Sequence, residues 1–238
     1  MAGTLEVSHL SWKRPGGSIL LDDVSFVVGE GHKVALVGDN GVGKSTIMRL
    51  IAGDEVGNTG TIRVDGRLGI MRQLVGSVRD TTTLRQFFVT LAAPALRDID
   101  AQIQRLEQLM ATDPTDRNGV RYAGALAAWG DQRGYELEVL WDTVTTVVLS
   151  LPFGEVTNRR LGTFSGGEQK RLALEILLRS DDDILMLDEP DNFLDIPGKR
   201  WLEEQIATTR KTVLFVSHDR KLLAAASTKV VTLEGKGC

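Results

Sequence analysis

The chain has 238 residues, of which 42% are hydrophobic and 25% charged, and this balance is typical of a globular protein with one sizeable core. Its formal net charge of −4 at pH 7 argues against capture of nucleic acid by overall charge, although it does not exclude local basic patches. The longest apolar runs, such as residues 144–152, fall well short of the roughly 20 apolar residues that a membrane-spanning helix needs, so we expect no membrane insertion.

The first residues and the cysteine usage indicate the compartment. The opening sequence MAGTLEVSHL has neither a basic region nor a long apolar stretch, so we expect no signal peptide or transit sequence, and a cytoplasmic location. The single cysteine, Cys238, excludes an internal disulfide and a metal cluster built from several cysteines of this chain.

Short segments with strand-like patterns open the chain, at residues 5–10, 19–21 and 24–28. A Pro-Gly-Gly turn at residues 15–17 separates the first from the second, and two glycines after residue 28 end the third. This arrangement predicts an antiparallel sheet.

A strand, a glycine-rich loop and a helix come next, in that order. The apolar segment 34–37 runs into GDNGVGKST, and apolar residues then recur at helical spacing over residues 47–51 before Gly53. A further strand at residues 60–66 leads through another apolar segment to Gln73.

The pattern is helical from about residue 82 to residue 151. Apolar residues at alternating spacings of three and four form the seam of a coiled coil over two heptads: Leu96, Ile99, Ile103, Leu106 and Met110. A loop and a second apolar helical stretch through Trp129 come after it, so we predict an antiparallel helical hairpin over about residues 95–132. After Gly134, a further helix is expected to present one broad apolar face: Leu137, Leu140, Trp141, Val144, Val147 and Val148.

Strands and helices alternate through the rest of the chain. The expected helices cover residues 166–178, 201–206 and 222–226, and the expected strands cover residues 184–187, 212–216 and 230–233. Because several of these strands are apolar throughout, we predict a parallel sheet that helices cover on both faces, and hence an α/β fold.

The loop after residue 37 fits the phosphate-loop pattern of two glycines, a lysine and a serine at fixed spacing. Its backbone amides can turn inward around phosphate oxygens, Lys44 can reach the terminal phosphates, and the Ser45 hydroxyl can bind Mg²⁺. A chance glycine turn is the alternative, but the strand before the loop and the helix after it argue against that interpretation. The residues assigned to phosphate binding are Gly38, Asp39, Asn40, Gly41, Val42, Gly43, Lys44, Ser45 and Thr46.

The segment ILMLDEP places two acidic residues at the end of a buried strand. Asp188 can hold the coordination shell of magnesium, and Glu189 can orient or deprotonate an attacking water. A solvated strand end is the alternative, but the four apolar residues before the pair aim it at the carboxyl edge of the sheet, where ligands of such sheets bind.

The segment FVSHDR ends the next strand in the same way and places His218 at the same edge, where it can contact a terminal phosphate. A lone histidine at a strand end is more often a polar cap, so this assignment depends on the neighbouring motifs. Ser217, His218 and Asp219 are contiguous and therefore do not form a nucleophilic triad, whose members meet in space.

In their order along the chain, the phosphate loop, Gln73, FSGGEQKR, LMLDEP, NFLD and SHD closely resemble the motifs of the nucleotide-binding domain of ATP-binding cassette (ABC) proteins. The resemblance covers essentially the whole chain. It implies a P-loop NTPase of ABC type, with a mainly parallel sheet core, an N-terminal antiparallel β subdomain and a helical subdomain that carries the hairpin. We therefore expect one nucleotide-binding domain, with residues 1–80 in the ATP-binding core, residues 81–165 in the helical subdomain, and residues 166–238 carrying the signature helix and the rest of the core.

The resemblance also implies roles for individual residues. The family signature, which acts on the nucleotide of a partner cassette, corresponds to Ser165, Gly166, Gly167 and Glu168. The magnesium ligands would be Ser45, Gln73 and Asp188, and the catalytic residues would be Lys44, Glu189 and the switch histidine His218. Asp195 would close the loop that crosses the interface between two cassettes.

Within the family, the chain looks most like the ABC-F branch, whose members act on ribosomes and do not pump solutes. About 90 residues separate Gln73 from Ser165, and the excess over a transporter ATPase coincides with the predicted hairpin, which resembles the arm of ABC-F proteins. The segments DQRGYELEVLWDTV and DEPDNFLD also resemble that branch, although Asp191 and Phe193 replace its usual Thr and His.

Two features depart from the family pattern. The family usually stacks adenine on an aromatic residue before a Pro-Gly-Gly turn, whereas here Arg14 stands there and Trp12 lies two residues earlier, on the same face of the expected strand. Either residue could stack on the base. ABC-F proteins also carry two cassettes, and this sequence resembles a first cassette alone, so we expect a second cassette as partner, in the same protein or as a homodimer mate.

The resemblance thus implies a cassette that binds and hydrolyses ATP with Mg²⁺, slowly in isolation, and that acts on the ribosome in translation or in antibiotic resistance. Two alternatives stay open: the ATPase subunit of an ABC membrane transporter, and a nucleotide-gated binding module with little turnover. The long hairpin counts against the transporter subunit.

Overall fold

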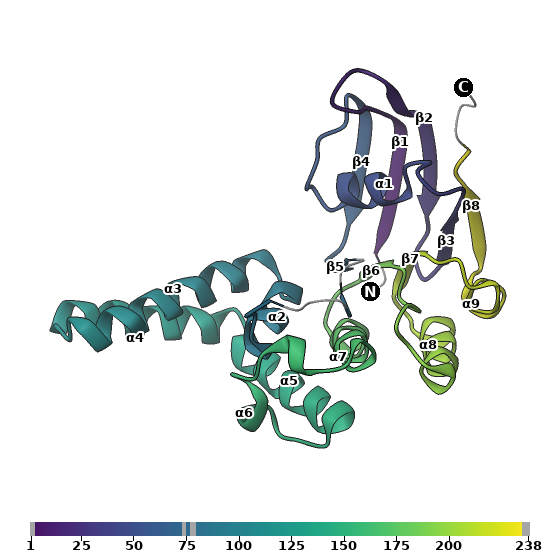
Figure 1. Ribbon diagram of the computed structural model, residues 1–238. Helices are drawn as coiled ribbons and strands as arrows, with labels where there is room; N and C mark the ends of the chain where they lie inside the picture. The colour runs from purple at the N-terminus through teal and green to yellow at the C-terminus, as the bar shows by residue number, and fades with distance from the viewer. Residues whose placement is uncertain (1–2, 73–74, 77–79, 235–238) are drawn as a thin grey trace.

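The computed structural model describes residues 3–72, 75–76 and 80–234, which contain two β-sheets (Figure 1). The antiparallel sheet has the order β2-β1-β4, with β1 at Thr4–Lys13, β2 at Ile19–Val28 and β4 at Thr59–Asp65. The other sheet has the order β5-β6-β7-β3-β8, with β5 at Leu68–Met71, β6 at Ile184–Asp188, β7 at Thr212–Val216, β3 at Lys33–Val37 and β8 at Lys229–Thr232. Its strand pairs are parallel, which confirms the predicted α/β core.

The helices occur in the predicted order along the chain. They are α1 (Lys44–Ile51), α2 (Leu84–Leu91), α3 (Pro94–Thr112), α4 (Asp116–Asp131), α5 (Gly134–Leu149), α6 (Phe153–Val156), α7 (Gly166–Arg179), α8 (Ile196–Thr208) and α9 (Arg220–Ala226), with a 3₁₀ turn at Leu161–Thr163. In the part of the chain that the structure describes, no helix combines the length and the apolar character that a membrane span requires.

The parallel sheet is buried on both faces because its central strands are apolar at consecutive positions. Successive residues of a strand point to opposite faces. Val34 and Leu214 pack with α1 and the antiparallel sheet in one core, whereas their neighbours Ala35 and Phe215 pack with α7 and the helical subdomain in a second core. The sheet therefore separates two apolar cores.

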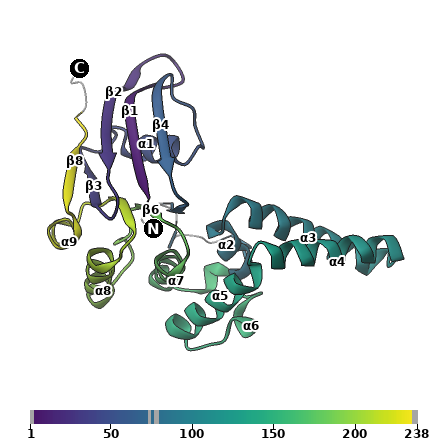
Figure 2. The ribbon, with the colours of Figure 1, turned by 180° about the vertical axis from the view of Figure 1, so that it is seen from behind.

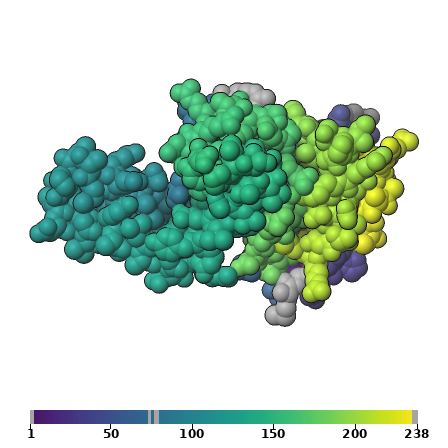
Figure 3. Space-filling view, turned by 90° about the horizontal axis from the view of Figure 1, so that it is seen from below, coloured from purple at the N-terminus to yellow at the C-terminus, as the bar shows by residue number. Residues whose placement is uncertain are grey.

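Helices α3 and α4 form the predicted hairpin, which extends away from the two sheets (Figures 1 and 2). Ile103 and Leu106 of α3 and Ala125 and Trp129 of α4 are buried between the hairpin and its base. From below, the hairpin, coloured teal, stands out at one side of the molecule (Figure 3). It is thus a projection from the nucleotide-binding body, and little of it packs on the sheets.

The predicted apolar face of α5 is correct except at Val147. Trp141 and Val144 are fully buried and Val148 packs against the same core, but Val147 is 53% exposed. Val144 and Val148 lie one helical turn apart and form the inward stripe, so Val147 falls beside that stripe and toward solvent.

Arg85 of α2 contacts α3, α4 and α5 at the base of the hairpin. Its guanidinium forms ion pairs with Asp100 of α3 at 2.8 Å and with Glu138 of α5 at 3.3 Å, and it also lies over the rings of Trp129 and Trp141. Because these five residues come from four helices, the hairpin is fixed at its root by both charge and packing.

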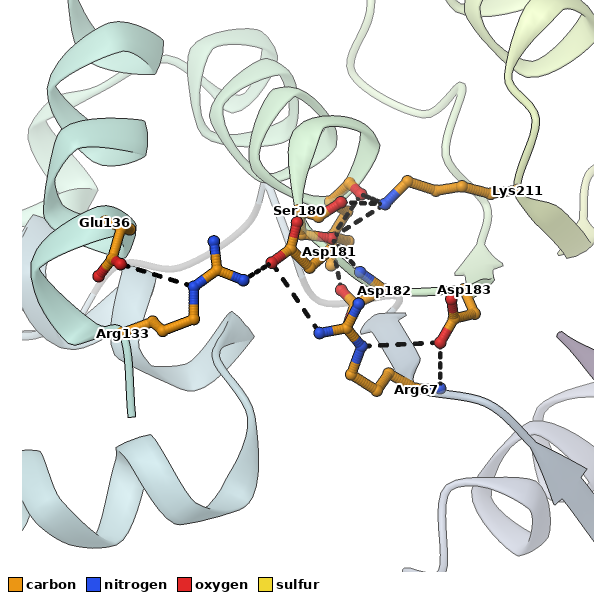
Figure 4. A network of polar contacts seen from close by, with 9 residues as sticks. Arg67, Arg133, Glu136, Ser180, Asp181, Asp182, Asp183 and Lys211 are labelled. Carbon is orange, nitrogen blue, oxygen red and sulfur yellow. Dashed lines mark hydrogen bonds and ion pairs between the residues drawn. The ribbon is translucent and has the colours of Figure 1, made fainter. Parts of the chain in front are cut away.

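A second polar network joins the root of the hairpin to the parallel sheet (Figure 4). Arg133, which precedes α5, donates to Asp181 at 2.6 Å, and Arg67 before β5 approaches both Asp181 and Asp183. Lys211 caps the C-terminal end of α7, because its Nζ donates to the carbonyl of Ser180 at 2.5 Å. The loop that leads into β6 is therefore held from the helical subdomain on one side and from the sheet on the other.

Candidate nucleotide site

The phosphate loop connects β3 to α1 and depends on glycines for its shape. Gly43 precedes α1 with φ 114°, and a side chain there would come within 2.6 Å of Leu21. Gly38 has φ 154°, and a Cβ there would clash with the Leu233 carbonyl oxygen. Only glycine avoids both the strained backbone and the clash at these two positions, so the predicted loop is built as the motif requires.

Lys44 is almost fully buried and folds back along its own loop. Its Nζ donates to the carbonyl oxygens of Gly38 at 2.7 Å and Asp39 at 3.0 Å. Beside it lies a cavity of about 390 Å³. The predicted residues that line this cavity are Arg14, Asn40, Gly41, Gly43, Lys44, Ser45, Thr46, Glu189 and His218.

Asp188 ends β6 next to this cavity with 8% of its surface exposed. Burial, and then the neighbouring charge of Glu189, raises the pKa of its carboxyl to about 6, while the cations of Lys170 and Lys44 oppose that rise. A buried carboxylate of this kind is stabilised by a nearby cation. Together with the Ser45 hydroxyl, it offers the hard oxygen ligands that Mg²⁺ accepts in company with phosphate oxygens.

The structure brings Glu189 and His218 together. Glu189 Oε1 lies 4.0 Å from His218 Nε2, and Glu189 Oε2 accepts a hydrogen bond from Asn192 Nδ2 at 2.6 Å. Both side chains line the cavity beside Lys44. The three residues predicted to be catalytic therefore share one cavity.

The signature residues lie in a different cavity, of about 550 Å³. Ser165 and Glu168 form a capping box at the start of α7, in which the Glu168 amide donates to Ser165 Oγ at 3.2 Å and the Ser165 amide donates to Glu168 Oε2 at 2.6 Å. Gly166, Gly167 and Asp195 line the same cavity, and Asp195 also caps α8 through the Gly198 amide at 2.8 Å. The signature thus takes no part in the cavity of the phosphate loop.

The structure separates Arg14 from Trp12. Strand β1 ends at Lys13 and its pairing with β2 shifts register at Trp12, so the two residues do not share a strand face. Trp12 packs against the apolar core under the antiparallel sheet. Arg14 lines the phosphate-loop cavity and donates to the Gly41 carbonyl at 3.4 Å. Of the two, only Arg14 is among the described residues that line this cavity.

Gln73, the predicted glutamine ligand of magnesium, lies outside the described residues, as does Cys238.

Three polar residues of the site were not found by motif reasoning. Lys170 is fully buried on α7 and donates its Nζ to the Glu189 carbonyl at 3.0 Å, and burial lowers its pKa to about 8. Asp191 accepts from the Ser217 hydroxyl at 2.7 Å, and Asn192 contacts Glu189 as described above. The available signal was that Lys170 lies on the apolar stripe of its helix, where an unpaired charge is unfavourable.

Comparison with known proteins gives a match to the family described as ABC transporter over residues 21–192. The chain is 44% identical to an "Antibiotic resistance protein" of Mycobacteroides abscessus, over 97% of this chain and 42% of that protein. It is 37% identical to "Tylosin resistance ATP-binding protein TlrC" of Streptomyces fradiae, over 96% of this chain and 42% of that protein. It is 31% identical to "Energy-dependent translational throttle protein EttA" of Mycobacterium tuberculosis, over 93% of this chain and 39% of that protein.

The chain therefore spans about two fifths of the length of each of these relatives. Its phosphate loop, its buried acidic strand end and its separate signature cavity lie within or next to the matched segment. The chain belongs to the ABC transporter family.

Proposed function

We propose that the chain is the ATP-binding and ATP-hydrolysing cassette of an ABC-F type protein that acts on the ribosome, and that it works by closing head to tail on a second cassette. One observation carries the two-cassette part of this proposal. The capped signature residues from Ser165 to Glu168 lie with Asp195 in their own cavity, apart from the phosphate loop of the same chain. A helix N-terminus with two glycines is suited to phosphate, so the signature is available to the nucleotide of a partner.

Within one cassette, each side chain of the site would have a separate role, which follows from its position in the cavity. The Lys44 ammonium would neutralise the terminal phosphates from the floor of the cavity, and Ser45 and Asp188, with Gln73, would hold Mg²⁺. The metal would polarise the phosphate oxygens that it shares with these residues. Glu189 would orient and deprotonate water, and His218 would sense the terminal phosphate next to it.

The ribosome enters the proposal through the relatives and the hairpin. Two relatives carry antibiotic or tylosin resistance in their names, and a third is described as a translational throttle protein. The hairpin of α3 and α4 projects from the body and is rooted by Arg85, so it can reach a partner without moving the nucleotide site. A cassette that only drives a permease has no evident use for such a projection.

The test is co-sedimentation of the natural full-length protein with ribosomes, with ADP and with a non-hydrolysable ATP analogue. We expect the protein in the ribosome pellet with the analogue and mostly in the supernatant with ADP. Recovery in the supernatant under both conditions would favour the ATPase subunit of a transporter. Phosphate release from ATP would be measured separately. Pelleting that depends on the analogue, in a protein that releases no phosphate from ATP, would instead identify a nucleotide-gated binding module.

A further inference from the structure

Lys170 connects the signature helix to the acidic end of β6. It lies in the second turn of α7, its side chain is 0% exposed, and its Nζ donates to the Glu189 carbonyl at 3.0 Å. The carboxylates of Asp188, Asp191 and Glu189 supply the compensating negative charge. A buried ammonium is unfavourable unless it is paired and hydrogen-bonded, so the burial of Lys170 depends on this hydrogen bond and on the neighbouring carboxylates.

The backbone of Glu189 needs such a contact. Its φ of 49° lies in the left-handed region, which is strained for a non-glycine residue and persists only where surrounding contacts fix it. Its amide donates to the Val216 carbonyl of β7 at 2.9 Å. Its carbonyl accepts from Lys170 Nζ of α7 at 3.0 Å and, over a longer distance, from the Asn192 amide at 3.3 Å. The two peptide groups of this residue are therefore held from two different elements.

The held backbone decides where the carboxylate lies. In this conformation Glu189 follows the end of β6, and its side chain lines the cavity of the phosphate loop. There His218 and Asn192 lie near its two carboxylate oxygens. Without the Lys170 donor, the carbonyl would keep only the longer hydrogen bond from the Asn192 amide, and the peptide group would be held less firmly. The carboxylate would then lose its direction toward the position of an attacking water, and a misplacement of about 1 Å can lower a rate by about 100-fold.

We infer that Lys170 is a positioning residue for ATP hydrolysis, which fixes the Glu189 carboxylate from the signature helix. The inference rests on the proposed hydrolysis at Glu189. Helix α7 is continuous from its cap at Ser165, and Lys170 lies about 7.5 Å along its axis from that cap. Lys170 therefore links the helix that carries the signature directly to the backbone of this chain's own Glu189.

The experiment measures kcat and KM for ATP in the natural full-length protein carrying Lys170→Met. This substitution keeps the length of the side chain but removes its donor and its charge. We expect kcat to fall by about tenfold or more and KM to stay within about twofold, because the phosphate loop is untouched. In a Glu189→Gln background, Lys170→Met should cause no further loss, since it acts through Glu189.

Lys33→Met is the matched control. Lys33 is also a buried lysine whose Nζ donates to backbone carbonyls, those of Gly31 at 2.6 Å and Lys211 at 2.9 Å, but it lies at the start of β3, away from the cavity. It should lose stability and keep kcat within about twofold. Equal kcat in the folded Lys170→Met and Lys33→Met proteins would overturn the inference. If Glu189→Gln itself retained hydrolysis, the proposed function would fail instead.

Two further variants cover the case in which Lys170→Met does not fold. Lys170→Gln has a polar but shorter side chain, whose amide falls short of the Glu189 carbonyl, and Lys170→Met/Asp191→Asn removes one buried charge of each sign. Both should show the lowered kcat with unchanged KM. Wild-type kcat in either folded variant would contradict the role of Lys170 as directly as the single substitution would.

Discussion

Glu189 shows how a single residue can combine strain with function. It is one of six non-glycine residues with positive φ among those described, and it alone of these lines the phosphate-loop cavity. Its amide, carbonyl and carboxylate all have partners, so the unusual backbone is held from several sides. The strain thus coincides with the group that the proposed chemistry needs to be fixed.

Replacing Glu189 by Gln should reduce ATP hydrolysis by about 100-fold or more while leaving nucleotide affinity within a few-fold. The amide keeps the size of the side chain but cannot accept a proton, and general bases typically contribute factors of about 10²–10⁴. Phosphate release and nucleotide binding would be measured on the same preparation. Glu204→Gln, on the exposed side of α8, serves as the control and should leave both quantities unchanged.

The neighbouring residues Asp182 and Asp183, which precede β6, should change the stability of the fold in opposite directions as the pH changes. Burial raises the pKa of Asp182, so its folded state favours the protonated form, and stability is lost as the pH rises through its folded pKa. A hydrogen bond from the Arg67 amide lowers the pKa of Asp183, so its contribution is present at neutral pH and is lost as the pH falls through its folded pKa.

Urea unfolding at pH 7 and near pH 3 would separate the two effects, because the Asp183 contribution is lost only below the ordinary carboxyl pKa of 3.8. Relative to wild type, Asp182→Asn should become more favourable to stability as the pH rises, and Asp183→Asn should become less favourable. The same pH trend for both variants would mean that one of the two directions is wrong.

At the scale of elements, α7 and α2 begin with the same device. Ser165 with Glu168 and Thr83 with Gln86 each form a capping box. Either Ser165→Ala or Thr83→Ala should lower the free energy of unfolding by about 1 kcal/mol, since one capping bond is lost in each. Only Ser165 lines the signature cavity.

If the chain works with a second cassette as proposed, Ser165→Ala should therefore also slow ATP hydrolysis by the full protein, whereas Thr83→Ala should not. Denaturation and phosphate release measured together would check this difference. Equal hydrolysis in the two variants would leave Ser165 with a structural role alone.

The elements that sequence predicted well are those whose signals are local. The phosphate loop follows the apolar strand β3, Asp188 ends β6, and His218 comes two residues after β7, so the strand pattern also places these residues at the sheet edge. The position of Arg14 could not be predicted from sequence. It depends on a register shift in β1, which cannot be read from the alternation of apolar and polar residues along the strand. The burial of Lys170 depends on packing between α7 and β6, which only the folded chain brings together.

At the scale of the whole molecule, the hairpin can be shortened without opening the core. Deleting residues 107–121 and closing the gap with two glycines would leave the buried Leu106 and Trp129 in place. We expect nucleotide affinity to stay within about twofold, because the phosphate loop packs on the opposite core. ATP-dependent pelleting with ribosomes should be lost, and its retention would show that the hairpin is not the contact.

The parallel sheet separates two apolar cores, and we expect each core to open as a separate cooperative unit. Each core closes on its own side, so local opening of one need not expose the other. Leu172→Ala, which opens a cavity beside α7, should speed hydrogen exchange in α5 and α7 and leave the amides of β1 and α1 protected. The phosphate loop is then expected to stay folded when packing around the helical subdomain is weakened.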